Sequence, residues 1–415
     1  MDKGFEFVKR FAEWEDDNHL FGWKIAKVNI WPYLRDIIGR IVFKKIEKIP
    51  YYINYHYLKS NENASKWDIY KYFDWSSLKK ADVLFFNSGR RQKIDGKWHS
   101  PYLDDFLPEL NYSFFVLEPI GNACIVVPPH DNMILFDPNH LAVKIHEDSD
   151  ITRETYRFCQ KLEKDFSIEL DDSEKKEISQ AIHSIVQNYE RYIKLYYAIL
   201  KIVRPKVLII TMRMQLSVNY LVEAAKMCGV KSIEYEHGMM DIPHNTQRCF
   251  AYKKKIATFP DYFWGLSSLD LLYYHYLPIP RENIMPIGNA FHEKRIHELN
   301  HMGNKNELPN NMKEILIISN AISTSGLMEL AISLSESLDE TKYCVSFRLH
   351  PEERYIWNKK YPKLNFSKVF VQGINMNHDI NYYIQRSYCV VGIESTALIE
   401  ALELNRRVYV YCRGD

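Results

Sequence analysis

Residues 343–351 read Tyr-Cys-Val-Ser-Phe-Arg-Leu-His-Pro, and residues 388–396 read Tyr-Cys-Val-Val-Gly-Ile-Glu-Ser-Thr. Each stretch begins as a short apolar run, which is typical of a buried parallel strand, and ends in polar residues. Open parallel sheets bind their ligands at the carboxyl ends of the strands. A histidine and two hydroxyls at two such ends indicate a site for a phosphate-bearing ligand.

Strand-like and helix-like segments alternate around these two stretches. Further strands are predicted at 81–87, 114–117, 124–127, 207–210, 231–235, 314–319 and 408–411, and helices at 171–204, 219–228, 327–338 and from Ala397. Such alternation predicts parallel sheets with right-handed crossovers. A polar run at 297–311 indicates a linker. We therefore predict an α/β protein with a helical region at 1–78 and two doubly wound Rossmann-type domains at 79–300 and 301–415.

Length, charge and cysteine content limit the class of protein. At 415 residues the chain is too long for one ordinary core. A net charge of +1 argues against a nucleic-acid binder. The seven cysteines are odd in number and form no CxxC pair, which favours reduced thiols in the cytoplasm. With no signal-like N-terminus and no long apolar run, we expect a protein that is soluble or at most peripheral to a membrane.

The segment from Trp31 to Lys48 is a basic amphipathic helix by pattern. Such a helix can lie on an anionic membrane surface, or it can pack on its own domain with a solvated basic face. We favour the second alternative.

His350 and the Ser395-Thr396 pair are the main candidates in the second half. An imidazole beside a nucleotide phosphate could hydrogen-bond the leaving group and protonate it. Ser395 and Thr396 stand at the start of a helix, where free N–H groups and hydroxyls can bind an anion or simply cap the helix.

Other polar residues should reach the same edge of the sheet and bind the donor. They are Arg348, which could instead be a packing residue, Glu394, and the loop residues Ser323, Thr324 and Ser325.

Glu236 and His237 follow a strand in the first half and precede Gly238. Either could be the general base for an acceptor hydroxyl. A metal cluster that adds Asp241 and His244, or plain loop polarity, are the alternatives.

Arg90, Arg91 and Asp241 are candidates for binding the acceptor. The stretch Asp148-Ser149-Asp150 has the D-x-D form that can hold a divalent ion, but it lies in an acidic segment that looks solvated.

These motifs resemble those of the GT-B glycosyltransferases of bacterial surface polysaccharides, closest to the polysialyltransferase and Kdo-transferase type. The three matching motifs are Glu236-His237-Gly238, His350-Pro351 and Ser395-Thr396. The resemblance implies two Rossmann-type domains that face a central cleft. It also implies an inverting reaction without a metal or other cofactor. Glu236 would be the base, His350 the acid on the donor phosphate, and Ser395-Thr396 the phosphate site.

The chain is also similar to the CDP-glycerol and CDP-ribitol polyol-phosphate transferases, whose first motif carries a His-Gly like His237-Gly238. The base therefore stays open between Glu236 and His237. GT-B chains usually continue into a closing helix, so we expect that helix to be missing after Asp415 or replaced by the N-terminal helical region.

From this resemblance we expect transfer of a sugar from a nucleotide-activated, possibly CMP-linked donor. The acceptor would be a capsular or lipopolysaccharide O-antigen glycan, free or lipid-linked, at the inner membrane surface. A CDP-polyol phosphotransferase of teichoic-acid type and a non-catalytic subunit of glycan assembly are the alternatives.

Overall fold

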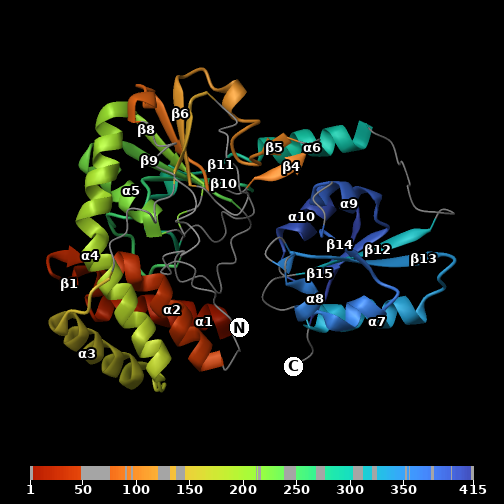
Figure 1. The fold of residues 1–415 in the computed structure, drawn as a ribbon, viewed down its shortest axis with the longest axis horizontal. Helices are drawn as coiled ribbons and strands as arrows, with labels where there is room; N and C mark the ends of the chain where they lie inside the picture. The colour runs from red at the N-terminus through yellow and green to blue at the C-terminus, as the bar shows by residue number, and fades with distance from the viewer. Residues whose placement is uncertain are drawn as a thin grey trace. The chain divides into compact units, whose positions relative to one another are not determined.

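The computed structural model describes residues 3–47, 75–88, 91–94, 97–119, 131–136, 145–211, 213, 216–237, 249–267, 276–301, 312–319, 325–350, 353–354, 356–374, 378–393 and 395–412. The chain forms two compact units (Figure 1). Unit 1 comprises Met1–Arg90 and Leu110–Gly288, and unit 2 comprises Arg91–Glu109 and Asn289–Asp415.

Unit 1 is built on a seven-stranded sheet in the order β11-β10-β9-β8-β3-β6-β7. Its strands are β3 (Val83–Phe86), β6 (Phe114–Pro119), β7 (Met133–Phe136), β8 (Val207–Ile210), β9 (Lys231–Tyr235), β10 (Tyr262–Gly265) and β11 (Ile284–Pro286). Each pair of neighbours is parallel. The chain fills the sheet from β3 outward to β7, then from β8 outward to β11. This reversal between β3 and β8 is the switch point of a doubly wound sheet.

Five helices of unit 1 are described: α1 (Lys3–Asp17), α2 (Trp31–Glu47), α3 (Ser149–Phe166), α4 (Asp172–Val203) and α5 (Leu216–Met227). Between α1 and α2 lie a 3-10 turn, η1 (Leu20–Gly22), and a short antiparallel pair, β1 (Lys24–Ile25) with β2 (Val28–Asn29). Two further turns are η4 (Trp75–Ser77) and η9 (Arg281–Asn283). The N-terminal helical region is therefore present.

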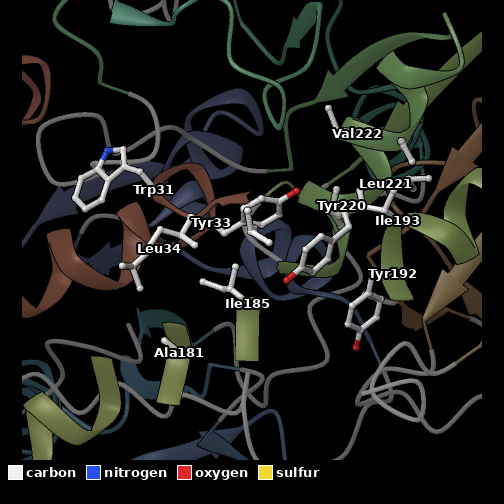
Figure 2. Close-up of a cluster of buried hydrophobic side chains, with 14 of the residues drawn as sticks. Trp31, Tyr33, Leu34, Ala181, Ile185, Tyr192, Ile193, Tyr220, Leu221 and Val222 are labelled. Atoms are coloured by element: carbon white, nitrogen blue, oxygen red, sulfur yellow. The ribbon is translucent and has the colours of Figure 1, made fainter. Parts of the chain in front are cut away.

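The long helix α4 is the element on which other helices of unit 1 pack. A capping box between Asp171 and Glu174 begins it, and Arg204 ends it in a left-handed conformation directly before Pro205. Its apolar stripe, which includes Ile178, Ile182 and Ile185, is buried, and α2, α3 and α5 pack against the helix (Figure 1). Figure 2 shows how Tyr33 from α2, Tyr192 from α4 and Tyr220 from α5 meet in this core.

The basic helix α2 packs on its own domain. Trp31, Leu34 and Ile38 are fully buried. Lys45 pairs with Glu174 at 2.7 Å, so part of the basic face meets acidic groups of α4. Helix α2 therefore packs on its own domain, as favoured, but part of its basic face pairs with acidic groups instead of lying in solvent. No helix within the described ranges is long and apolar enough to span a bilayer.

Unit 2 is a second doubly wound unit, with a five-stranded sheet in the order β14-β13-β12-β15-β16. Its strands are β12 (Lys313–Ile318), β13 (Tyr343–Arg348), β14 (Phe370–Gln372), β15 (Cys389–Gly392) and β16 (Arg407–Val410), all parallel to their neighbours. The order reverses between β12 and β15, which makes that gap the switch point. The predicted pair of doubly wound, Rossmann-type domains is confirmed.

Helices cover both faces of this sheet (Figure 1). One face packs against α7 (Ser325–Ser337), α8 (Trp357–Lys360) and the 3-10 turn η12 (Pro362–Phe366). The other packs against α6 (Ala290–His301), α9 (Ile380–Arg386) and α10 (Thr396–Glu403).

The division between the units differs from the sequence-based division at 300/301. Helix α6 belongs to unit 2, whose larger segment begins at Asn289. The segment 91–109 also belongs to unit 2, although it lies between β3 and β6 in sequence. It forms the hairpin β4 (Gln92–Ile94) and β5 (Lys97–His99) and the turn η5 (Leu107–Glu109). The predicted strand at 124–127 lies outside the described residues.

Candidate functional site

At the carboxyl edge of the sheet in unit 2, Ser395 and Thr396 lie beside the switch point, and His350 lies just past the end of β13. Because α7 follows β12 and α10 follows β15, both helices begin at this edge. Gly392 ends β15, and a Cβ there would lie 3.1 Å from the Leu398 side chain and 3.5 Å from the Ile318 carbonyl oxygen. A glycine therefore lets β15 turn into α10 close to the end of β12.

Ser395 is the N-cap residue of α10, in extended backbone conformation, yet its side chain makes no capping hydrogen bond. Its hydroxyl is therefore not used for ordinary capping. Together with the first N–H groups of α10, it can serve as a donor to an anion. Thr396 is the first residue of α10, and both residues are partly exposed.

His350 follows β13 and lies partly exposed in a turn that the structure fixes through its main chain. The His350 N–H donates to the Ser319 Oγ at 2.9 Å and to the Glu353 Oε2 at 3.0 Å. The Glu353 N–H donates back to the His350 carbonyl oxygen at 2.9 Å. Ser319 directly follows β12, so these bonds join the ends of two neighbouring strands.

Glu353 is a residue that our sequence analysis missed. It is 1% exposed, and it also accepts from Lys360 Nζ at 2.6 Å and Tyr361 OH at 2.5 Å. Burial raises the pKa of this carboxyl, but hydrogen bonds from Lys360, Ser319 and Tyr361 outweigh it and lower the pKa. The residue is thus ionised at neutral pH.

A sequence signal for Glu353 did exist. In His350-Pro351-Glu352-Glu353, a Pro at the first turn position and a Glu two residues later match half of a capping box. The glutamate of such a box reaches back to the N–H of the cap residue, as Glu353 does to His350.

Arg348, at the end of β13, is buried rather than open at the edge. It is 6% exposed and lies over the Tyr383 ring, 4.4 Å from the centroid. Its Nη2 donates to the His378 carbonyl oxygen at 3.4 Å, while Nη1 has no hydrogen-bond partner among the described residues. Burial lowers the pKa of this guanidinium. The packing alternative therefore describes Arg348 as it stands.

The other donor-site candidates contribute less to the described geometry. Ser325 begins α7. Ser323, Thr324 and Glu394 lie outside the described residues.

In unit 1, the structure separates Glu236 from His237 by exposure. Glu236 is 0% exposed, and its Oε2 accepts from the Leu266 N–H at 2.9 Å. Its own N–H donates to the Trp264 carbonyl oxygen at 2.9 Å, so Glu236 joins the ends of β9 and β10. His237 is partly exposed. Of the two, His237 is the one that an external hydroxyl can approach.

Further buried polar groups line the carboxyl edge of the unit 1 sheet. Arg213, past β8, lies 3.6 Å from Glu234 of β9. Asn87, past β3, donates to Glu118 of β6 at 2.6 Å. We did not single out Arg213 or Glu118 from sequence, although each lies at or just beyond a predicted strand end.

The remaining first-half candidates lie elsewhere or outside the described residues. Arg91 is buried, with its Nη1 2.9 Å from the Asp104 carboxylate within the segment 91–109. Arg90 and Asp241 are outside the described residues, as is His244.

Asp148 is the N-cap of α3, where it accepts from the N–H groups of Asp150 and Ile151. This accounts for the D-x-D stretch as a helix start. Among the described residues, no group of three or more His, Cys, Asp or Glu is arranged to hold a metal.

The fold and site together define a two-domain, doubly wound α/β protein with polar strand ends in both units. No protein-family model matches the chain, and no curated protein matches it in sequence. Among solved structures it is similar to UDP-GlcNAc 2-epimerase of Methanocaldococcus jannaschii in complex with UDP-GlcNAc and UDP (10% identity, covering 79% of this chain and 83% of that chain, TM-score 0.44).

It is also similar to the wall teichoic acid polymerase TagF (13% identity, covering 91% of this chain and 78% of that chain, TM-score 0.42). A third similar structure is Anabaena HepE in complex with UDP and glucose (11% identity, 79% of each chain, TM-score 0.40). At these identities and TM-scores the likeness carries no argument about activity, and the assignment of two doubly wound units rests on strand order.

Proposed function

We propose that this protein is a transferase that moves a sugar from a nucleotide-activated donor to a hydroxyl of a glycan. The observation that carries this is the switch point of unit 2. The Ser395 hydroxyl and the start of α10 lie on one side of β12, and the fixed His350 turn lies on the other. Two strand spacings amount to about 10 Å, so both can contact one nucleotide diphosphate or sugar phosphate.

In this proposal, unit 2 binds the leaving group. The N–H groups at the start of α10 and the hydroxyls of Ser395 and Thr396 hold the phosphate. The bond between the anomeric carbon and the phosphate oxygen breaks, and its electron pair stays on the phosphate. The His350 imidazolium donates a hydrogen bond or a proton to that oxygen. The residues named supply this chemistry without a metal.

The base belongs to unit 1. The acceptor oxygen attacks the anomeric carbon from the side opposite the phosphate, with inversion, and its proton passes to the base. We assign this role to His237, because Glu236 is buried and bound to the Leu266 N–H. Glu236 then holds the loop that carries His237. This assignment reverses the order that the polysialyltransferase resemblance implied.

The burial of Glu236, which leaves His237 as the base, also supports a second candidate function. A histidine base in a His-Gly motif is the pattern of the CDP-polyol phosphotransferases that the sequence resembles, with polyol phosphate rather than sugar as the transferred group. A CMP-linked donor, a capsular or O-antigen acceptor (free or lipid-linked) and a cytoplasmic site at the inner membrane surface remain parts of the first proposal.

The first test is a thermal-shift panel with CMP, CDP, UDP, GDP and their sugars. A ligand of the native state raises the unfolding midpoint by mass action. We expect one nucleotide to stabilise the wild type and to lose most of that effect in Ser395→Ala/Thr396→Ala. Asp339→Asn, which alters an exposed carboxylate beyond the end of α7, is the control and should keep the full shift.

Turnover then separates the two candidate functions. With the donor identified, His237→Ala and His350→Ala should each lower kcat by about 100-fold or more. The product carries a sugar in the first case and a polyol phosphate in the second. A wild type that binds no nucleotide would refute both.

A further inference from the structure

The turn that carries His350 is built around a carboxylate to which the proposed reaction gives no role. Glu353 Oε2 accepts from the Ser319 hydroxyl and the His350 N–H, and Oε1 accepts from Lys360 and Tyr361. Two of these donors come from the ends of β12 and β13. The other two donors are Lys360, at the end of α8, and Tyr361, directly after it, and both bind Oε1.

We infer that Glu353 is a positioning residue, which fixes Ser319 and the His350 main chain in one geometry and keeps a negative charge next to that main chain. The inference rests on the proposed function in one respect, namely that the two loops hold the donor phosphate. The carboxylate does not touch the reacting atoms. It acts through the residues that do.

Geometry gives the first reason. A carboxylate with four donors cannot shift without breaking several charge-assisted bonds, so the strand ends it joins are held together. The backbone adds further bonds, since the Ser319 N–H donates to the Arg348 carbonyl oxygen at 2.9 Å. A rigid pair of loops is what a site needs when it must hold a leaving group within a fraction of an ångström.

Charge gives the second reason. Glu353 is ionised, because its lowered pKa keeps the proton off at neutral pH. Glu353 Oε2 lies 3.0 Å from the His350 main-chain nitrogen, and a buried negative charge at this position favours a positive charge on the side chain of the same residue. From Arg348 to Tyr361 the chain also carries the charged or titratable residues Arg348, Glu352, Arg354, Tyr355, Lys359, Lys360 and Tyr361. All of them are unchanged in a Glu353→Gln variant.

Unit 2 contains a matched control. Glu314 is also 1% exposed, and it accepts from Ser346, Gln372 and Arg386 at 2.5, 2.6 and 2.9 Å. It lies at the opposite end of β12 from Ser319. Glu314→Gln thus removes an equally buried and equally bonded charge away from the site.

The experiment compares wild type, Glu353→Gln and Glu314→Gln in the full chain, with ¹³C-labelled histidine. The His350 signal is assigned by its loss in His350→Gln and followed by NMR through a pH titration. The Kd for CDP is measured by calorimetry. We expect the His350 midpoint to fall in Glu353→Gln only, because that variant alone removes the neighbouring negative charge. The Kd for CDP should rise about tenfold in Glu353→Gln and less than twofold in Glu314→Gln.

Ser319→Ala separates position from charge and keeps the test open if Glu353→Gln folds poorly. It removes one donor and leaves the carboxylate ionised, so it should weaken CDP binding without moving the His350 midpoint. If Glu353→Gln and Glu314→Gln behave alike in both measurements, Glu353 is merely structural and the inference is overturned. If no nucleotide binds the wild type, the proposed function fails. The His350 titration then shows by itself whether the Glu353 charge affects the protonation of His350.

Discussion

At the scale of single residues, Tyr220 is a tyrosine whose ring is packed in the core of unit 1 while its hydroxyl makes no hydrogen bond to any described residue. Its ring stacks on Tyr192 at 4.9 Å and on Tyr33 at 4.6 Å between centroids (Figure 2). The hydroxyls of Tyr33 and Tyr189 both donate to Glu223. The Tyr220 hydroxyl is buried and has no hydrogen-bond partner within the part of the chain that the structure describes. The ring therefore stabilises this core, and the hydroxyl does not.

We predict that Tyr220→Phe leaves stability unchanged or raises it by about 1 kcal/mol, since a buried unpaired hydroxyl disappears. Tyr189→Phe should lower stability by about 1 kcal/mol, because Glu223 loses a donor in a partly buried setting. Urea unfolding followed by tyrosine fluorescence measures both. A loss in Tyr220→Phe as large as that in Tyr189→Phe would contradict this account of the cluster.

At the scale of elements, a buried ion pair joins the N-terminal helices to the rest of unit 1. Arg35 of α2 donates to both oxygens of Glu15 of α1, at 2.5 and 2.8 Å, and also to the Cys249 carbonyl oxygen at 2.5 Å. Burial raises the pKa of the Glu15 carboxyl in spite of the arginine beside it. Removal of either partner leaves a buried polar or charged group without its counter-charge.

Glu15→Leu and Arg35→Met should each cost about 3–5 kcal/mol, and the double variant Glu15→Leu/Arg35→Met clearly less than the sum. Thermal unfolding of the four proteins completes the cycle. Glu190→Gln, which breaks an exposed pair with Lys194 on α4, is the control and should leave the midpoint in place. Additive losses would show that the pair acts as two separate groups.

At the amino edge of the unit 1 sheet, Asp82 makes a hydrogen bond and an ion pair whose strength depends on pH. Asp82, just before β3, accepts from the Ser113 hydroxyl at 2.6 Å and pairs with Lys206 at 2.8 Å, so it joins the starts of β3, β6 and β8. The Lys206 and Ser113 hydrogen bonds lower the pKa of Asp82 to about 2.

Because the folded-state pKa lies below the unfolded value of about 3.9, the contribution of Asp82 is present above pH 4 and is lost as the pH falls toward 2. We predict that Asp82→Asn has a lower unfolding midpoint than wild type at pH 6. The difference should shrink between about pH 4 and pH 2. Unfolding midpoints of both proteins recorded across this pH range test the prediction. A difference between the two midpoints that stays constant with pH would show that the charge of Asp82 is not the cause.

At the scale of the whole molecule, each unit has its own core. The large apolar cluster of α1, α2, α4, α5 and the first sheet lies within unit 1, and two clusters flank the second sheet within unit 2. The chain passes between the units at residues 90/91, 109/110 and 288/289. The segment 91–109 is fixed to unit 2 by a bond of 2.7 Å between Lys294 and Asp105 and by His99 packed beside Phe291.

Separate cores predict separate unfolding. Differential calorimetry should resolve two transitions, of which a bound nucleotide raises only the one that belongs to unit 2. Tyr189→Phe should lower only the other. A single transition that moves as one with both perturbations would mean that the units unfold cooperatively.

The sequence by itself determined the α/β class and the strands β3, β6, β8, β9, β12, β13, β15 and β16, because apolar runs and turn residues are local patterns. It predicted neither the strands β7, β10, β11 and β14 nor the helices α3, α6, α8 and α9. It also placed His350, Ser395 and His237 at strand ends. Tertiary structure alone decided which groups are buried and what they contact. Glu353 meets Ser319 across 34 positions, Arg35 meets Cys249 across 214, and Lys294 meets Asp105 across 189. Local patterns extend over a few turns of chain, whereas desolvation and charge pairing depend on neighbours that only the folded chain brings together.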